Sequence, residues 1–150
     1  MKYDFDHSLG KITMQLSKTL GRKLEEKFNQ NGIKINPGHW SIISMLYQKK
    51  DMIQKEIGNT LSVDKVMITR LVDQLEVKRI IVRITSENDK RINHIHLPDS
   101  GRKLYVKLKP FAQETITEAF RGIDEKEIRK CIDLLNRVYS NLINSAKQTP

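Results

Sequence analysis

The stretch IIVRITSENDKRINHIHLPDSG at residues 80–101 predicts a β-hairpin with a charged tip. Ile80 to Thr85 is a run of mostly β-branched residues, residues 86–90 are polar turn material, and Asn93 to Leu97 alternates polar and apolar side chains. The tip, Asp89-Lys90-Arg91, carries three charges that a protein core does not accept. These charges must therefore face water or a partner, and an anionic partner is the simplest candidate.

Two short helices are predicted directly before this hairpin. Residues 54–61 form a brief helix, in which Gly58 lowers helix propensity by about 1 kcal/mol relative to alanine, so we expect another helix to approach closely there. A second helix follows, whose apolar residues recur at the spacing of one buried face: Ile68, Leu71, Val72 and Leu75. Asp64, at the end of the connector Ser62-Val63-Asp64, is its expected N-cap. Two short helices joined by so brief a turn predict a helix-turn-helix.

Longer amphipathic helices are predicted on the N-terminal side. Apolar residues recur every three or four positions from Leu9 to Phe28, and Gly32 is expected to end that helix. Asn36 and Pro37 then predict the start of the next helix, with Asn36 as N-cap and Pro37 at the first helical position. The residues expected to line its buried side are Trp40, Ile43, Leu46 and Tyr47.

Two further helices are predicted after the hairpin. Pro98 and Asp99 are expected to open the first, and Pro110 to kink or break it. Asp124 and Glu127 have the spacing of a capping box at the start of the second. The apolar stripe of this last helix comprises Ile128, Cys131, Ile132, Leu135, Val138, Leu142 and Ile143. The chain ends in a polar tail at residues 147–150.

The composition indicates a basic protein of ordinary domain size. Its 150 residues include 27 Lys and Arg against 18 Asp and Glu, which gives a net charge of +9 and a pI of about 9.7. Such a charge is typical of nucleic-acid binders, although it also occurs in basic proteins without such a partner. The single cysteine excludes an intramolecular disulfide, and neither a signal peptide nor a membrane span is recognisable, so a cytoplasmic location is expected. No catalytic motif, cofactor motif or Cys/His metal cluster is present, which argues against an enzyme.

The predicted second helix of the helix-turn-helix has an outer side suited to a major groove. With the apolar stripe inward, the outer side comprises Lys65, Val66, Met67, Thr69, Arg70 and Asp73. A major groove about 12 Å wide admits one helix, and the N-terminal residues of that helix reach the base edges. Arg70 can pair bidentately with guanine, and Val66 and Met67 can meet a thymine methyl group. Thr69 can bond a base or a phosphate, and Lys65 is better placed for phosphate.

The hairpin adds basic residues that suit a narrow minor groove. Arg91 is the expected inserting residue, because such grooves have an enhanced negative potential. Asp89 is expected to orient Arg91 through a carboxylate–guanidinium pair, the alternative being a simple turn residue. Lys90 is a looser expected phosphate contact, and Arg83 lies beside the hairpin as another.

These segments together resemble the multiple-antibiotic-resistance regulator (MarR) family. The residues that carry the resemblance are Gln54-Lys55-Glu56-Ile57-Gly58, Val63-Asp64-Lys65, the run Thr69-Arg70-Leu71-Val72-Asp73-Gln74-Leu75-Glu76, and Asp89-x-Arg91-x-x-x-Ile95-x-Leu97-x-x-x-Gly101. Their order and spacing, with the flanking helices, are more specific than any one piece. The similarity covers nearly the whole chain.

The resemblance implies a mainly α fold with a small β-hairpin wing. It implies a winged helix-turn-helix at residues 36–97 and long dimerisation helices at residues 1–35 and 98–150, within a single chain unit of residues 1–150. Such a protein is a homodimeric regulator, most simply a repressor, that binds double-stranded DNA at a palindromic operator. Release by a small-molecule effector is a further implication, and a regulator without an effector is equally compatible. The alternative from another class is a winged-helix protein–protein interaction module.

Two positions depart from the family pattern. Arg79 stands where the family usually has glycine after the recognition helix, so the helix must either avoid a left-handed residue there or accept strain. Arg79 is also an expected phosphate contact. Pro98 stands where the family usually starts the next helix with Thr or Ser, so either Asp99 takes over the capping or the boundary shifts.

Two further features of the sequence invite a sensing role. His94 and His96 share one face of a predicted strand, but no third ligand is clearly placed by sequence, so we expect no metal there. Cys131 lies on an apolar helical stripe, where a buried thiol favours packing over redox chemistry. The sensing cysteine of the family lies near the N-terminus, where this chain has none.

Overall fold

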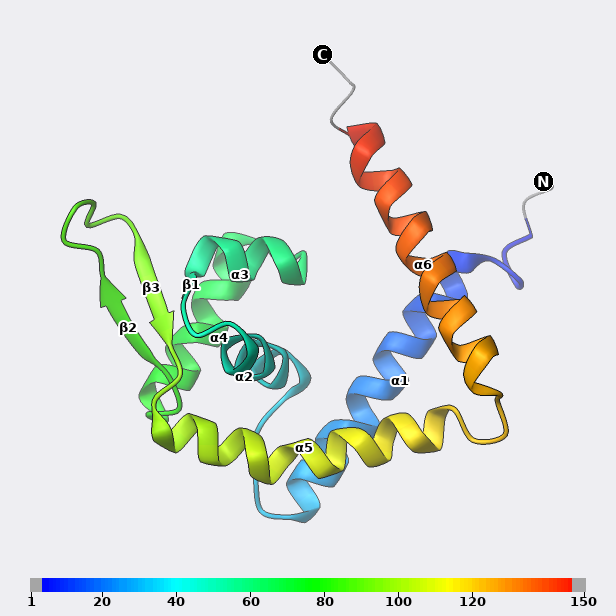
Figure 1. The fold of residues 1–150 in the computed structure, drawn as a ribbon, viewed down its shortest axis with the longest axis horizontal. Coiled ribbons are helices and arrows are strands. Elements are labelled where there is room, and N and C mark those ends of the chain that lie inside the picture. Colours follow the sequence, from blue (N-terminus) through cyan, green and yellow to red (C-terminus); the bar gives the residue numbers. More distant parts are fainter. Residues whose placement is uncertain (1–3, 147–150) are drawn as a thin grey trace. The chain divides into compact units, whose positions relative to one another are not determined.

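The computed structural model describes residues 4–146, so the predicted polar tail lies outside the described residues. Along the chain these residues form α1 (Leu9–Gln30), α2 (Pro37–Gln48), β1 (Met52–Ile53), α3 (Gln54–Leu61), α4 (Lys65–Val77), β2 (Val82–Thr85), β3 (Asn93–His96), α5 (Asp99–Ala119) and α6 (Glu125–Ala146) (Figure 1). The predicted class, mainly α with a small hairpin, is confirmed. Contacts group the chain into two compact units, residues 1–115 and 116–150.

The predicted helix starts are present as real caps. The Asn36 side chain accepts from the backbone N–H of His39 at 2.8 Å, with Pro37 at the first position of α2. The Asp64 carboxylate accepts from the backbone N–H of Met67 at 2.7 Å and so satisfies one of the orphan donors of α4. At α6 the Asp124 carboxylate accepts from the backbone N–H of Lys126 at 2.8 Å. These caps fix where each helix begins.

The wing is a three-stranded antiparallel sheet in the order β1-β3-β2. The hairpin of β2 and β3 projects beyond the helices of its unit in Figure 1. Ile95 pairs with Met52 on one side and with Arg83 on the other, and its side chain is fully buried. Strand β1 has no signal in the sequence, because a strand of two residues shows no alternation.

The core of the first unit forms around the predicted faces of α2 and α4. All four predicted α4 residues are buried, and the principal fully buried side chains are Phe28, Ile42, Ile43, Leu46, Ile57, Val72, Leu75, Ile81, Ile95 and Leu108. The predicted α2 residues Trp40 and Tyr47 are half-buried and stack on Tyr105 of α5, with ring centroids 5.3 and 3.8 Å away. Helices α1, α2 and α5 therefore all supply side chains to the core that supports the helix-turn-helix.

Two glycines mark close approaches within this unit. A Cβ on Gly58 would lie 3.3 Å from Ile68 of α4, so the expected close contact between α3 and α4 is confirmed. A Cβ on Gly101 would lie 2.3 Å from the carbonyl oxygen of Ile80 and 2.5 Å from the Leu97 side chain. Only glycine fits at position 101 without a shift of the backbone that leads into the wing.

Three details differ from or complete the sequence predictions. Helix α5 runs through Pro110 without interruption, so a break there is wrong. The helix begins at Asp99, which lies in its first turn. The residue before it, Pro98, accepts at its carbonyl from the backbone N–H of Arg102 at 2.9 Å. Arg79 adopts the left-handed conformation with φ of 57°. The chain therefore accepts strain at this position.

The N-terminal half of α1 and the stripe of α6 carry exposed apolar side chains. On α1 the predicted stripe is buried at Phe28 and exposed at Leu9, Ile12 and Leu16. On α6 the exposed residues of the stripe are Ile132, Leu135, Val138, Leu142 and Ile143. Cys131 is exposed as well, so the prediction that its thiol is buried is wrong for the chain by itself. Within residues 4–146 no helix is long and apolar enough to cross a membrane.

Candidate nucleic-acid interface

Four of the five predicted reading residues lie on the exposed side of α4. Lys65 and Arg70 are exposed, and the Val66 side chain, at 79% exposure, and Met67, at 42%, are large apolar groups left in water. Exposed apolar residues carry a cost that a partner surface removes. The first two turns of α4 thus present two cations and two apolar side chains to the outside.

Thr69 is different from its neighbours, because it is half-buried and its hydroxyl is engaged. The hydroxyl donates to the Lys65 carbonyl at 2.7 Å and accepts from the Gln54 side-chain amide at 3.1 Å. Gln54 is the first residue of α3, so this contact joins the two helices of the helix-turn-helix. The local geometry therefore gives Thr69 a part in holding α3 and α4 together.

The wing tip has the predicted pairing of Asp89 with Arg91. The Arg91 Nε and Nη2 atoms donate to the two Asp89 carboxylate oxygens, each at 3.0 Å, and the Arg91 backbone N–H donates to the same carboxylate at 3.0 Å. This guanidinium lowers the pKa of Asp89, and the carboxylate raises the pKa of Arg91. The Arg91 side chain is nevertheless 90% exposed. Asp89 is thus both the turn residue and the side chain that fixes the direction of Arg91.

Arg83 does not have the free guanidinium that a phosphate contact requires. Its side chain is only 21% exposed, and its two terminal nitrogens donate to Asp73 at 2.6 Å and to Glu76 at 2.9 Å. Arg83 thus clamps β2 to α4, and the guanidinium that the sequence assigned to phosphate is engaged by two carboxylates. The signal that was missed is the i, i+3 spacing of the two carboxylates on the helix, which places both on one side.

The strained residue Arg79 completes the C-terminal cap of α4. Its backbone N–H donates to the Glu76 carbonyl at 2.8 Å, and the N–H of Ile80 donates to the Leu75 carbonyl at 3.0 Å. These two bonds form a Schellman motif, in which glycine is the usual residue at the left-handed position. The Arg79 side chain is exposed.

The histidine pair of β3 lies beside a carboxylate that the sequence did not place. Asp51 lies 3.2 Å from His94 Nδ1 and 3.6 Å from His96 Nε2. These contacts connect β3 to the residue before β1 and hold the base of the wing. The described part of the chain contains no group of three His, Cys, Asp or Glu side chains that could hold a metal ion.

Comparison with known proteins agrees with this geometry. Residues 35–92 match the model of the MarR family. The chain is 29% identical over 107 residues to the HTH-type transcriptional regulator MhqR of Bacillus subtilis, which covers 71% of this chain and 74% of MhqR.

Solved structures share the fold at low sequence identity. A MarR-family transcriptional regulator from Rhodococcus superposes with a TM-score of 0.81 at 18% identity and covers 91% of this chain and 96% of its own. BpsR of Bordetella bronchiseptica, whose structure concerns regulation of DNA binding by 6-hydroxynicotinic acid, superposes with a TM-score of 0.80 at 15% identity, with coverages of 93% and 98%. Residues 35–92, which hold the winged helix-turn-helix, are thus a MarR-family domain, and the chain shares its fold with solved MarR-family transcriptional regulators.

Proposed function

We propose that the protein is a sequence-specific, double-stranded DNA-binding regulator that acts as a homodimer in the cytoplasm and has no catalytic role. Two observations carry the proposal: Lys65, Val66, Met67 and Arg70 are exposed on one side of α4, and the wing tip holds an arginine that is already oriented. In this role α4 enters the major groove, and Arg70 pairs with guanine while the two apolar side chains contact thymine methyl groups.

Arg91 is proposed to insert into the minor groove beside each half-site. Its guanidinium is held by Asp89 before DNA arrives, so less side-chain freedom is lost on binding. Lys90 and Arg79 are exposed and are proposed as phosphate contacts, whereas Arg83 is occupied by two carboxylates. Thr69 is proposed to act on DNA through the placement of α4.

The homodimer is supported by the exposed apolar faces of α1 and α6, each taken by itself. A second copy of the chain would cover these faces. Two recognition helices about 34–36 Å apart would then read a palindrome whose half-sites lie one helical turn apart. The two-fold symmetry of the dimer would thus match the two-fold symmetry of the operator.

The finer part of the proposal is that the protein is a repressor whose DNA binding is regulated by a small ligand. It is supported by the fold shared with BpsR, in which DNA binding is regulated by 6-hydroxynicotinic acid. A ligand that favours a lobe spacing unsuited to successive grooves needs a differential affinity of only about 1–3 kcal/mol to lower DNA affinity several-fold to over a hundredfold.

Titration with duplex DNA at several salt concentrations tests the proposed function. A regulator that neutralises phosphates shows a steep fall of log affinity with log salt concentration, together with a preference for its operator over random duplex. Flat salt dependence without any duplex preference would instead favour the alternative, a winged-helix module that docks an acidic protein surface.

A further inference from the structure

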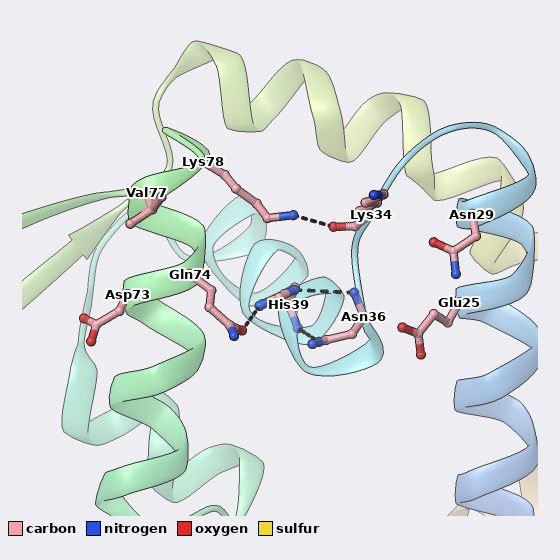
Figure 2. A pocket seen from close by; sticks show the side chains of 9 residues that line it. All are labelled: Glu25, Asn29, Lys34, Asn36, His39, Asp73, Gln74, Val77 and Lys78. Atoms are coloured by element: carbon pink, nitrogen blue, oxygen red, sulfur yellow. Dashed lines mark hydrogen bonds between the residues drawn. The ribbon is translucent and has the colours of Figure 1, made fainter.

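A pocket of about 580 Å³, lined mainly by polar and charged residues, lies beside the C-terminal half of α4. Its walls come from α1, from the connection between α1 and α2, from the start of α2 and from α4 (Figure 2). His39 of α2 lines this pocket and is only 5% exposed. None of the DNA contacts proposed above uses this buried titratable group.

The hydrogen bonds of His39 allow only one protonation form of its ring. The backbone N–H of Asn36 points at Nδ1 from 3.4 Å, and because that group is a donor, Nδ1 must accept. The proton of the neutral ring is therefore on Nε2, which donates to the Gln74 side-chain oxygen at 2.9 Å. A second proton, on Nδ1, would face the Asn36 donor and remove this half of the capping box of α2.

Two hydrogen bonds tie this same region to the recognition helix. Gln74 bonds to His39, and four residues later the Lys78 ammonium group donates to the Lys34 carbonyl at 2.7 Å. Figure 2 shows both bonds running from α4 toward α2 and the segment before it. Gln74 lies one turn beyond Arg70, so the bond from His39 constrains the helix that presents the reading side chains.

We propose that His39 is a positioning residue of the DNA-binding surface: its neutral ring accepts from Asn36 at Nδ1 and donates to Gln74 at Nε2, and in joining the two it holds α4 in its reading orientation. The inference rests on the proposed function of α4.

Charged groups of both signs face His39, and burial rather than these charges favours the neutral ring. They are Glu25 from α1, Lys34 from the connecting segment, and Asp73 and Lys78 from α4. Burial lowers the pKa of His39 below its ordinary value of 6.5; the bond from Gln74 opposes this shift, Lys78 adds to it and Glu25 opposes it. If the His39 ring leaves Asn36 and Gln74, it regains its ordinary pKa, so protonation favours the state in which these contacts are broken. The contacts are therefore complete above pH 6.5 and are lost as the pH falls below it.

The test is the pH profile of duplex affinity for the folded protein between pH 8 and pH 5.5, with circular dichroism at each pH to confirm folding. For the wild type we expect constant affinity above pH 6.5 and a fall of about fivefold or more below it. His39→Gln keeps a neutral donor toward Gln74 and should give a flat profile. His7→Gln, which removes an exposed histidine, is the matched control and should keep the wild-type profile.

Gln74→Glu supplies a second variant that retains His39. A carboxylate at position 74 favours the charged ring, so a protonated His39 can keep its contact with position 74. The loss of duplex affinity between pH 8 and acid pH should therefore be smaller in this variant than in the wild type. Equal acid losses in the wild type, His39→Gln and Gln74→Glu would overturn the positioning role while leaving the DNA-binding proposal intact. Failure of the wild type to bind any duplex at pH 8 would overturn the proposed function instead.

Discussion

Asp89 offers a test that separates orientation from charge at a single residue. Removal of its carboxylate makes the wing more positive, so electrostatic attraction alone predicts tighter binding of DNA. The bidentate pairing predicts the reverse, because Arg91 loses the partner that fixes its direction. We expect Asp89→Ala to weaken operator affinity in fluorescence anisotropy titrations.

Arg91→Ala is the companion variant of Asp89→Ala. It should weaken affinity further and relax the preference for A·T-rich flanks, where the minor groove is narrow. Tighter binding by Asp89→Ala than by the wild type would contradict the orienting role.

The strain at Arg79 predicts a stabilising substitution. A non-glycine residue in the left-handed region costs roughly 1–2 kcal/mol. Glycine removes this cost, but part of the gain is lost because glycine has more conformational freedom in the unfolded chain. Arg79→Gly should therefore raise the free energy of unfolding by about 1 kcal/mol in urea denaturation. Arg79→Ala removes the same side chain and keeps the strain, so it should give no such gain. Equal effects of the two variants would mean that the backbone conformation carries no cost.

At the scale of elements, the wing and the recognition helix are held together by Arg83. Its planar fork reaches Asp73 and Glu76 at once, which the single ammonium group of lysine cannot do in the same geometry. We expect Arg83→Lys to lower the free energy of unfolding by about 1 kcal/mol and to weaken duplex affinity. Because no phosphate contact is lost, the salt slope should stay unchanged. A variant with normal stability and a shallower slope would restore Arg83 as a phosphate contact.

Periodicity was sufficient to predict the helices, because one buried face repeats along each of them. The four apolar residues of α4 and the caps at Asn36 and Asp64 are local patterns, and the structure confirms them. The outer side of α4 followed by exclusion. The resemblance of the motif order to a known family then supplied the winged arrangement.

The features that sequence reasoning missed depend on contacts between distant residues. Strand β1 forms only because Met52 and Ile53 pair with β3, some forty positions later. The roles of Arg83 and Asp51 likewise come from partners on other elements. Pro110 leaves α5 unbroken, since packing against the core overrides the loss of one helical hydrogen bond. No local pattern carries this information.

For the whole molecule, the exposed stripe of α6 predicts self-association. Leu135 lies on this stripe, and Asn144, nine residues later, is half a turn out of phase with it. We expect the wild type to sediment as a dimer at micromolar concentration and Leu135→Glu to shift it toward the monomer, because a charge would be buried at the interface. Asn144→Glu adds the same charge on the other side and should remain dimeric. A monomeric wild type would contradict the homodimer.

Selection of bound sites from a random duplex pool shows whether α4 reads base sequence. We expect an enriched inverted repeat with half-site centres about 10–10.5 base pairs apart. Arg70→Ala should lose preference at one base position in each half-site, at a cost of ~1–3 kcal/mol, while other positions stay selected. Arg22→Ala, which removes an exposed arginine of α1, should select the same sites as the wild type. A pool with no enriched sequence, or identical selection by Arg70→Ala and the wild type, would contradict the account.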